Sequence, residues 1–272
     1  MTSIDLARLR KQTLRLADFF FAPDEFVRNF HTTLDSYVNY TVRTRRPARP
    51  GGRLPAHRTP PVVLRQIEQT LAALASASEN APATLALADR LWDEAWRETR
   101  LLAAYLLGQI PPQEAPVIAR LTAWIGTIRE PELRADLLET SLRRMRKNAP
   151  DIFLRLINEW ARPERARLWP AALRAGIAAA KDPAVGYFPS LVETLEPVIR
   201  SAPAEMQLDV EELFNALFDA SPTETTFLVR QMLAAPGDQP AAIVFRRMMP
   251  SLPAPLRDEI RELARGKSFS EA

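Results

Sequence analysis

The sequence predicts an all-α fold, in which antiparallel helical hairpins stack side by side into an α–α superhelix. Composition is the first observation: glycine is scarce (8) and proline abundant (24) among 272 residues, and good helix formers such as Ala, Leu, Arg and Glu dominate. The second is that runs of alternating Val, Ile and Thr, which are typical of strands, are missing. The third is position, because the prolines fall between segments with apolar residues at three- and four-residue spacing. Prolines so placed mark helix boundaries.

The N-terminal residues 1–42 are expected to form a helical hairpin. Ser3 is suited to cap the first helix, which would extend to about Phe21. Pro23 then interrupts the pattern, and a second helix is expected over residues 24–41.

Residues 43–61, RTRRPARPGGRLPAHRTPP, are the least helix-like part of the chain. Five prolines and two adjacent glycines prevent a packed helix there. Six arginines in the same stretch make it strongly basic. We therefore expect a long, basic, proline-rich surface loop.

Helices follow the loop in close succession. They are expected at about 62–78, 82–95, 97–110, 113–129, 131–147, 150–161, 164–180, 187–200, 204–219, 223–235, 239–249 and 254–265. Helices of this length with short links repeat as hairpins every 35–40 residues, which is the length of HEAT-like repeats. We therefore expect one helical-repeat domain over residues 1–272.

Several classes of protein are excluded by what the sequence lacks. There is no cysteine, so disulfides and thiolate metal ligands are absent, and the only histidines, His31 and His57, lie far apart in sequence. Neither a phosphate-binding glycine loop nor a Gly-x-Ser-x-Gly turn occurs. We expect no metal and no cofactor. Because no apolar run approaches the roughly 18 residues of a membrane span and no signal peptide is seen, a cytoplasmic location is expected.

Positive charge is concentrated near the N-terminus, where residues 1–60 hold 11 Arg or Lys against 5 Asp or Glu. Arginine forks match phosphate oxygens, so the basic loop is a candidate DNA-binding segment. A second basic cluster lies at the C-terminal end of the helix that ends before Pro150. The basic loop could instead be a solvated linker, and the second cluster could instead be a set of cations that complements the dipole of its helix. The candidate phosphate-binding residues are Arg43, Arg45, Arg46, Arg49, Arg53, Arg58, Arg143, Arg144, Arg146 and Lys147.

Aromatic and acidic residues supply the other candidates. Trp124, Trp160 and Trp169 either fill the core between repeats or line a cleft that stacks on bases or holds a cationic ring. Asp136 follows two apolar residues on its helix. Its carboxylate is expected either to pair with an arginine or to face the concave side of the stack.

Three motifs in the central segment carry a family resemblance. They are LWDEAWRETRLLAAYLLGQI, the run Asn148-Ala149-Pro150-Asp151, and INEW followed by RLWPAALRAGIAA. In these motifs the chain resembles the HEAT-like alkylpurine DNA glycosylases of the DNA alkylation repair family. The resemblance implies a superhelix whose concave basic face holds duplex DNA, and the excision of cationic alkylated purines by hydrolysis of the N-glycosidic bond. Counted back from Pro150, Asp136 lies within a residue of the family's catalytic aspartate.

Two features keep a second interpretation open. Pro170 stands where the family has an arginine, and the stretch from Asp209 to Glu212 is acidic where a helix facing DNA is expected. An acidic helix beside a duplex would repel phosphates. The alternative is therefore a non-catalytic helical-repeat scaffold that binds a protein or peptide on its concave face.

Overall fold

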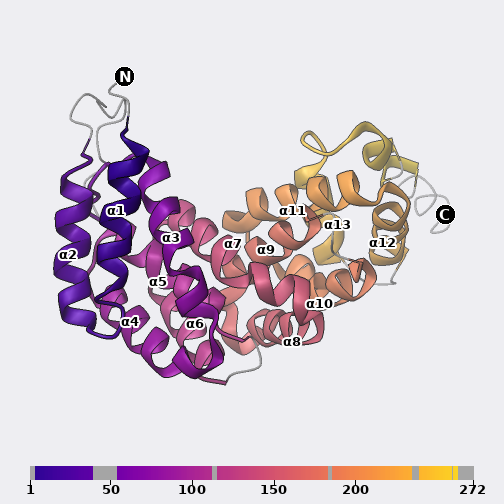
Figure 1. Cartoon of the computed structure of the whole chain (residues 1–272). Coiled ribbons are helices and arrows are strands. Elements are labelled where there is room, and N and C mark those ends of the chain that lie inside the picture. Colours follow the sequence, from indigo (N-terminus) through magenta and orange to yellow (C-terminus); the bar gives the residue numbers. More distant parts are fainter. Residues whose placement is uncertain are drawn as a thin grey trace, which may run out of the picture. The chain divides into compact units, whose positions relative to one another are not determined.

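The structure is a computed structural model that describes residues 4–38, 54–111, 115–182, 186–234, 239–258 and 260–262. These residues form α-helices and short 3₁₀ segments, and no strand occurs among them (Figure 1). The α-helices are α1 (Leu6–Ala17), α2 (Pro23–Asp35), α3 (Pro61–Ser76), α4 (Ala81–Asp93), α5 (Arg97–Gln109), α6 (Ala115–Thr127), α7 (Pro131–Asn148), α8 (Pro150–Ala161), α9 (Trp169–Ala180), α10 (Phe188–Ser201), α11 (Gln207–Ala220), α12 (Pro222–Ala234) and α13 (Gln239–Met248). The 3₁₀ segments are η1 (Ser78–Asn80), η2 (Pro163–Leu168) and η3 (Ala204–Met206). The prediction of an all-α fold is confirmed.

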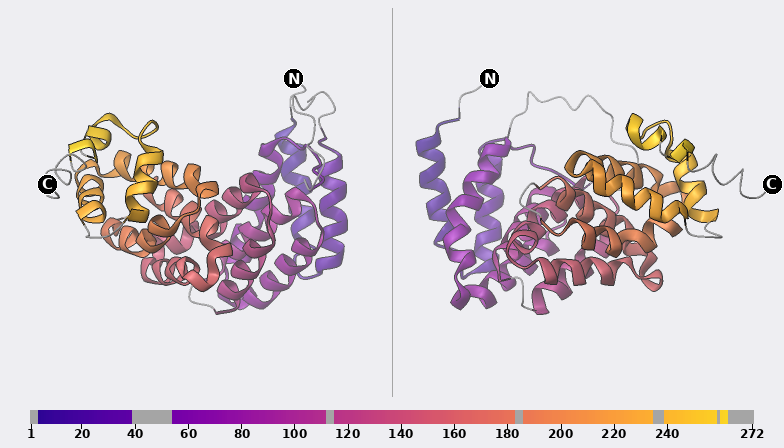
Figure 2. Two further views of the ribbon diagram at one scale, coloured as in Figure 1. Left: turned by 180° about the vertical axis from the view of Figure 1, so that it is seen from behind. Right: turned by 90° about the vertical axis from the view of Figure 1, so that its right-hand side faces the viewer.

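The chain divides into two compact units, Met1–Met145 and Arg146–Ala272. In the first unit, α1, α3 and α5 pack in one layer, while α2 and α4 form a second layer against them. In the second unit, α8 packs on α10 and α9 packs on α11 in the same two-layer manner. Figure 2 shows the helices of each unit from two further sides. Stacked antiparallel helix pairs are thus the building principle of each unit. The single domain expected over residues 1–272 stays a prediction.

Local sequence explains where the helices begin. The side chain of Asp5 caps α1 by accepting hydrogen bonds from the backbone N–H groups of Ala7 and Arg8 at 2.9 and 3.1 Å. The predicted cap, Ser3, lies outside the described residues. Proline stands in the first turn of α2, α3 and α8, where its missing N–H costs no hydrogen bond.

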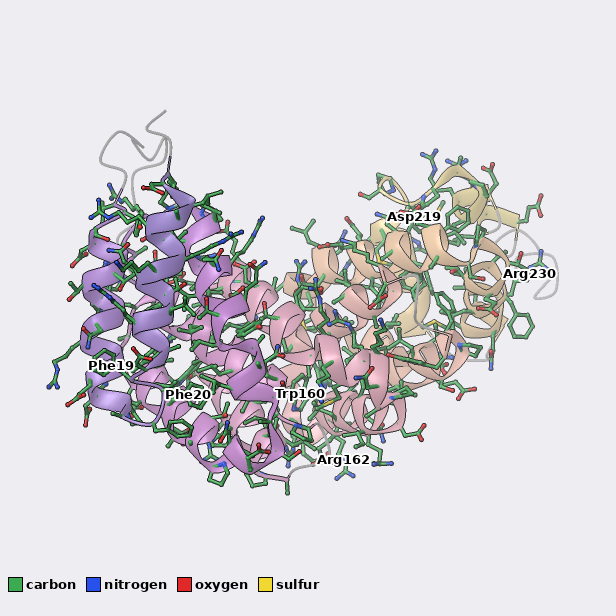
Figure 3. The ribbon with its side chains drawn as sticks, in the orientation of Figure 1. Phe19, Phe20, Trp160, Arg162, Asp219 and Arg230 are labelled. Atoms are coloured by element: carbon green, nitrogen blue, oxygen red, sulfur yellow. The ribbon has the colours of Figure 1, made fainter. Side chains whose placement is uncertain are left out.

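Figure 3 shows Phe20 and Trp160 within the helical stack of their own units, and both are fully buried.

The helix expected over residues 164–180 is divided in the structure. Residues Pro163–Leu168 form η2, and α9 begins only at Trp169. The reason is local, because Arg165 has a non-helical backbone (φ −113°, ψ 31°). In addition, the indole Nε1–H of Trp169 donates to the carbonyl oxygens of Ala161 and Arg162, both at 3.1 Å, and so satisfies groups at the end of α8.

Helices α5 and α7 approach each other closely at Gly108. A Cβ atom at this position would lie 2.9 Å from the carbonyl oxygen of Thr140 and 3.0 Å from the Cα of Ser141. Only glycine therefore permits this backbone contact. The contact fixes α7 against α5, and these two helices carry the Arg97–Asp136 ion pair described next.

Candidate active site

Asp136 lies on α7 with about half of its side chain exposed (49%). Its Oδ2 accepts a hydrogen bond from Nη2 of Arg97, the first residue of α5. The backbone N–H of Arg97 donates in turn to the carbonyl oxygen of Pro55 at 2.9 Å. The first alternative raised for Asp136, pairing with an arginine, is therefore realised, and the carboxylate also reaches solvent.

A cavity of about 350 Å³ opens beside this carboxylate, within the first unit. This size is typical of small-ligand sites. We call it the Asp136 cavity, and its lining residues come from α3, α5 and α7: Pro61, Leu64, Arg65, Glu68, Leu101, Asp136, Glu139 and Thr140. Apolar side chains therefore share the cavity with three carboxyl groups and one guanidinium group.

Two of the carboxyl groups in the cavity have different surroundings. Asp136 is held by Arg97, whereas Glu68 makes no hydrogen bond or ion pair with any residue that the structure describes. Burial raises the pKa of Glu68 from 4.5 to about 7, against the opposing positive charges of Arg65 and Arg143. Paired carboxyl groups whose environments differ in this way suit different chemical roles in one site.

The predicted basic loop is described only at its C-terminal end. Arg43, Arg45, Arg46, Arg49 and Arg53 lie outside the described residues. The first described residue after them, Leu54, donates its backbone N–H to Oε1 of Glu130 at 2.7 Å. Together with the contact of Pro55 with Arg97, this bond anchors the end of the loop beside the residue that holds Asp136.

Arg58 is exposed, and its backbone has a positive φ of 58°. This conformation is uncommon for a residue other than glycine and orients the chain as it enters α3.

The four residues of the second basic cluster differ in exposure, because they lie on different faces of α7. Arg143 and Lys147 are exposed, and they share the face of α7 that carries Asp136. Arg144 is partly buried and donates to the backbone carbonyl oxygen of Gln109. Arg146 is 2% exposed. The expectation that Arg146 contacts phosphate is therefore wrong in this structure, because its guanidinium group is inside the protein.

The three tryptophans proposed for an aromatic cleft lie in the core. Trp124 stacks on Trp92, with ring centroids 4.4 Å apart and planes inclined by 6°. Trp160 is fully buried, and Trp169 is buried with its indole N–H satisfied by backbone carbonyl oxygens. The structure corrects the cleft interpretation in favour of the core alternative, because rings this buried present no face to a base.

The structure also reveals a cluster that the sequence did not suggest, which we call the histidine relay: Asp35, His57, His31 and Glu94. Nδ1 of His57 lies 2.8 Å from Oδ1 of Asp35, and Nε2 of His57 lies 2.8 Å from Nδ1 of His31. Nε2 of His31 is 3.6 Å from Oε2 of Glu94. The rings of His57 and Trp96 stack at 4.3 Å. No spacing signal predicted these contacts, because the histidines are 26 residues apart and meet only through tertiary packing.

The acidic stretch of α11 is paired with cations from α9 and its end. Arg174 contacts Asp209 and Glu212, each at 2.5 Å, and Lys181 contacts Glu212 at 2.8 Å. Burial acts to raise the pKa of Glu212, but the hydrogen bond from Lys181 and the charge of Arg174 outweigh it and lower this pKa below its ordinary value. The negative charge that seemed to oppose DNA is thus largely compensated within the unit.

Within the described residues, no group of three or more His, Asp or Glu side chains is placed to hold a metal ion. The same part of the chain contains no helix whose length and apolar character would let it cross a bilayer. What the structure does contain is an all-helical stack with a carboxylate-lined cavity and exposed cations on the same helix.

These features define a helical-repeat protein with a candidate site in a cavity lined partly by carboxyl groups. A family model described as DNA alkylation repair enzyme matches residues 61–208, which extend from α3 into α11 and include the whole Asp136 cavity. The match covers more than half of the chain, and the chain belongs to this family. Membership supports a function in DNA repair. Comparison with curated proteins and with solved structures yields no match.

Proposed function

We propose that the protein binds duplex DNA and excises alkylated purines by hydrolysing their N-glycosidic bond, with Asp136 as the catalytic carboxylate. The observation that carries the proposal is the position of Asp136: half exposed in a cavity, oriented by Arg97, and inside the residues matched by the family. A cytoplasmic location accompanies this proposal as a prediction.

The chemistry follows from the charge of the substrate. Alkylation of a purine ring nitrogen makes the base cationic, so the base leaves with the bonding electrons and needs no added proton. Positive charge then develops on the deoxyribose, and a carboxylate beside the sugar stabilises it. Asp136 supplies that negative charge, and Arg97 holds the carboxylate in place so that little reorganisation is needed during the reaction. Water then adds to C1′ and releases one proton to solvent, which completes the hydrolysis.

Phosphate contacts would come from exposed cations near the cavity. Arg143 and Lys147 share a face of α7 with Asp136, and Arg58 is exposed just before α3. We extend this surface to the arginines outside the described residues: Arg43, Arg45, Arg46, Arg49 and Arg53. Each phosphate neutralised by such a side chain releases counterions, so binding should weaken steeply with salt.

The tryptophan rings are buried, so another group must attract cationic bases in preference to neutral ones. The cavity supplies one, because Asp136 and Glu139 place negative charge at its wall. A cation entering the cavity is attracted by both carboxylates, while a neutral undamaged base is not.

The test is single-turnover release of 7-methylguanine from alkylated duplex DNA. We expect Asp136→Asn to lower the rate by about 10²–10³-fold, because the substitution removes the charge but keeps the shape. Glu132→Gln is the matched control, since Glu132 is an exposed carboxylate on the same helix that lies outside the cavity. Equal release by wild type and Asp136→Asn would reject the assigned role.

The alternative, a non-catalytic scaffold for a protein or peptide, makes the opposite prediction for binding. Duplex affinity that does not change between about 50 and 200 mM salt, or that is absent at both, contradicts the DNA proposal. A loss of affinity with salt, together with base release, contradicts the scaffold.

A further inference from the structure

Glu68 is the group in the Asp136 cavity that the proposed mechanism does not use. It lies on α3 and faces the cavity together with Asp136 of α7 and Leu101 of α5. The Asp136 carboxylate is committed to Arg97, but the Glu68 carboxyl has no hydrogen-bonding partner among the described residues. A polar group of this kind at a cavity wall is available to a ligand.

The surroundings of Glu68 favour its neutral, protonated form. Leu64 and Leu101 give the cavity wall near Glu68 an apolar character, and burial is the main influence on its pKa, which is raised to about 7. Tyr105 of α5 is affected in turn, because burial and then the nearby Glu68 charge raise its pKa. The remaining charged neighbours are those of α3 and α7: Arg65, Asp136, Glu139 and Arg143. Helix α1 also packs on α3, and there the uncharged Thr13 accepts a hydrogen bond from Thr70.

We propose that Glu68 is a second catalytic residue, which donates a proton to a leaving base, and that the site therefore also excises neutral purine lesions. The proposal rests on the excision activity proposed above and extends its substrate class. A neutral purine is a poor leaving group until a ring nitrogen is protonated. A carboxylic acid in the same cavity as the sugar-stabilising carboxylate supplies that proton.

The step balances in protons and electrons. The Glu68 carboxylic acid transfers its proton to a ring nitrogen of the neutral base. The bond between C1′ and the base then breaks, and both bonding electrons go to the base. Water adds to C1′ as Asp136 stabilises the positive sugar, and the proton lost by this water returns to the Glu68 carboxylate. The base leaves as a neutral molecule, and Glu68 ends the cycle protonated.

For a cationic base the same sequence needs no donor. The alkylated ring already carries the positive charge, so Glu68 is dispensable for that substrate. The proposal therefore predicts a difference between two substrates in one variant, which a general loss of folding or DNA binding cannot mimic.

The experiment compares wild type, Glu68→Gln and Glu132→Gln on duplexes containing 7-methylguanine, which is cationic, or hypoxanthine, which is neutral. We expect Glu68→Gln to lower hypoxanthine release by about 10²-fold and to lower 7-methylguanine release far less, because a cationic base needs no proton donor. In wild type, hypoxanthine release should fall about tenfold per pH unit above pH 7, because Glu68 must be protonated. Glu132→Gln should behave as wild type on both substrates.

The outcomes separate this inference from the function on which it rests. Release of 7-methylguanine without any release of hypoxanthine overturns the wider substrate class and leaves the proposed function intact. Release of both by Glu68→Gln at wild-type rates overturns the role of Glu68. Release of neither by wild type overturns the proposed function itself, and this inference with it. A ¹³C NMR titration of the Glu68 carboxyl in the whole protein is independent of activity, and a midpoint near 4.5 would contradict the proton donor.

Discussion

The number of protons on the imidazole rings of the histidine relay determines which of its hydrogen bonds can form. His57 can donate from Nδ1 to Asp35 and from Nε2 to His31, while His31 directs its Nε2–H toward Glu94. This arrangement uses three protons on four ring nitrogens, which is one net positive charge between two carboxylates. A fourth proton would place two N–H groups against each other at 2.8 Å. The close approach of the two rings therefore opposes protonation of His31, in addition to its burial.

Acid should consequently loosen the first unit at the relay. Burial, followed by the charge of His57, lowers the pKa of His31 below 6.5, although Glu94 and Asp35 act in the opposite direction. Below pH 6.5 the unfolded chain therefore binds this proton before the folded protein does, and stability falls as the pH falls. We expect His31→Gln to reduce this loss of stability between pH 7.5 and 5.5, because the variant has no imidazole to protonate.

Urea denaturation at several pH values measures this prediction. Arg28→Gln on the same helix is the control, because Arg28 is largely exposed and its one ion pair among the described residues is a 4.0 Å contact with Glu25. Identical pH dependence in wild type and His31→Gln would show that the relay does not titrate as described.

The candidate site shows which residues a sequence can reveal and which it cannot. Asp136 was found because its position relative to Pro150 matches a family motif. Arg97 was not found, because it reaches Asp136 from 39 residues away, and nothing local marks it. Glu68 was missed for the same reason, since its unusual environment arises only when α3, α5 and α7 come together. The burial of Arg146 could have been anticipated, because it lies four residues after Leu142 and directly after Met145, two apolar residues of the buried face of α7.

At the scale of helices, prolines made the order and the boundaries of the elements predictable. The starts of α3, α7 and α8 fall within one residue of their expected positions, because proline suits a first turn and disfavours helix in the residue before it. The break between η2 and α9 was not predictable, because it depends on a hydrogen bond from the Trp169 side chain to the preceding helix. Boundaries set by backbone chemistry can be read from sequence, and boundaries set by tertiary contacts cannot.

The contact between α5 and α7 at Gly108 can be tested by adding a methyl group at this position. In Gly108→Ala the new methyl group meets backbone atoms of Thr140 and Ser141, which can move only if the helices separate. We expect a loss of about 1–3 kcal/mol in the free energy of unfolding, in spite of the better helix propensity of alanine. Because Arg97 and Asp136 lie on these two helices, base release should also slow.

Gly176→Ala is the matched comparison in the second unit. There the added methyl group would meet mainly Cδ1 of the Leu195 side chain, and a side chain can change rotamer where a backbone cannot. We expect a smaller destabilisation and no change in base release. Thermal unfolding of both variants measures the difference. A Gly108→Ala protein as stable as wild type would mean that the two helices are not in firm contact.

Over the whole molecule, positive and negative charges are unevenly distributed along the sequence. The basic excess in residues 1–60 has few acids to offset it. In the second unit, Arg174 and Lys181 are held by Asp209 and Glu212. Net charge alone, which is +3, hides this difference. The distribution implies that the pairs on α11 limit how strongly the second unit attracts a polyanion.

Removing the two acids should therefore strengthen DNA binding. In the double variant Asp209→Asn and Glu212→Gln, Arg174 and Lys181 lose their partners and become available to phosphates. We expect tighter duplex binding at low salt and a slope of log affinity against log salt that is steeper by about 1–2 units. The control is Glu193→Gln with Glu205→Gln, which makes the same change in net charge at two exposed positions of the same unit. An equal increase in slope for both double variants would mean that the gain comes from the overall electrostatic field of the protein. An increase only for Asp209→Asn with Glu212→Gln would mean that Arg174 and Lys181 themselves contact DNA. No increase for either double variant would place the second unit outside the DNA-binding surface.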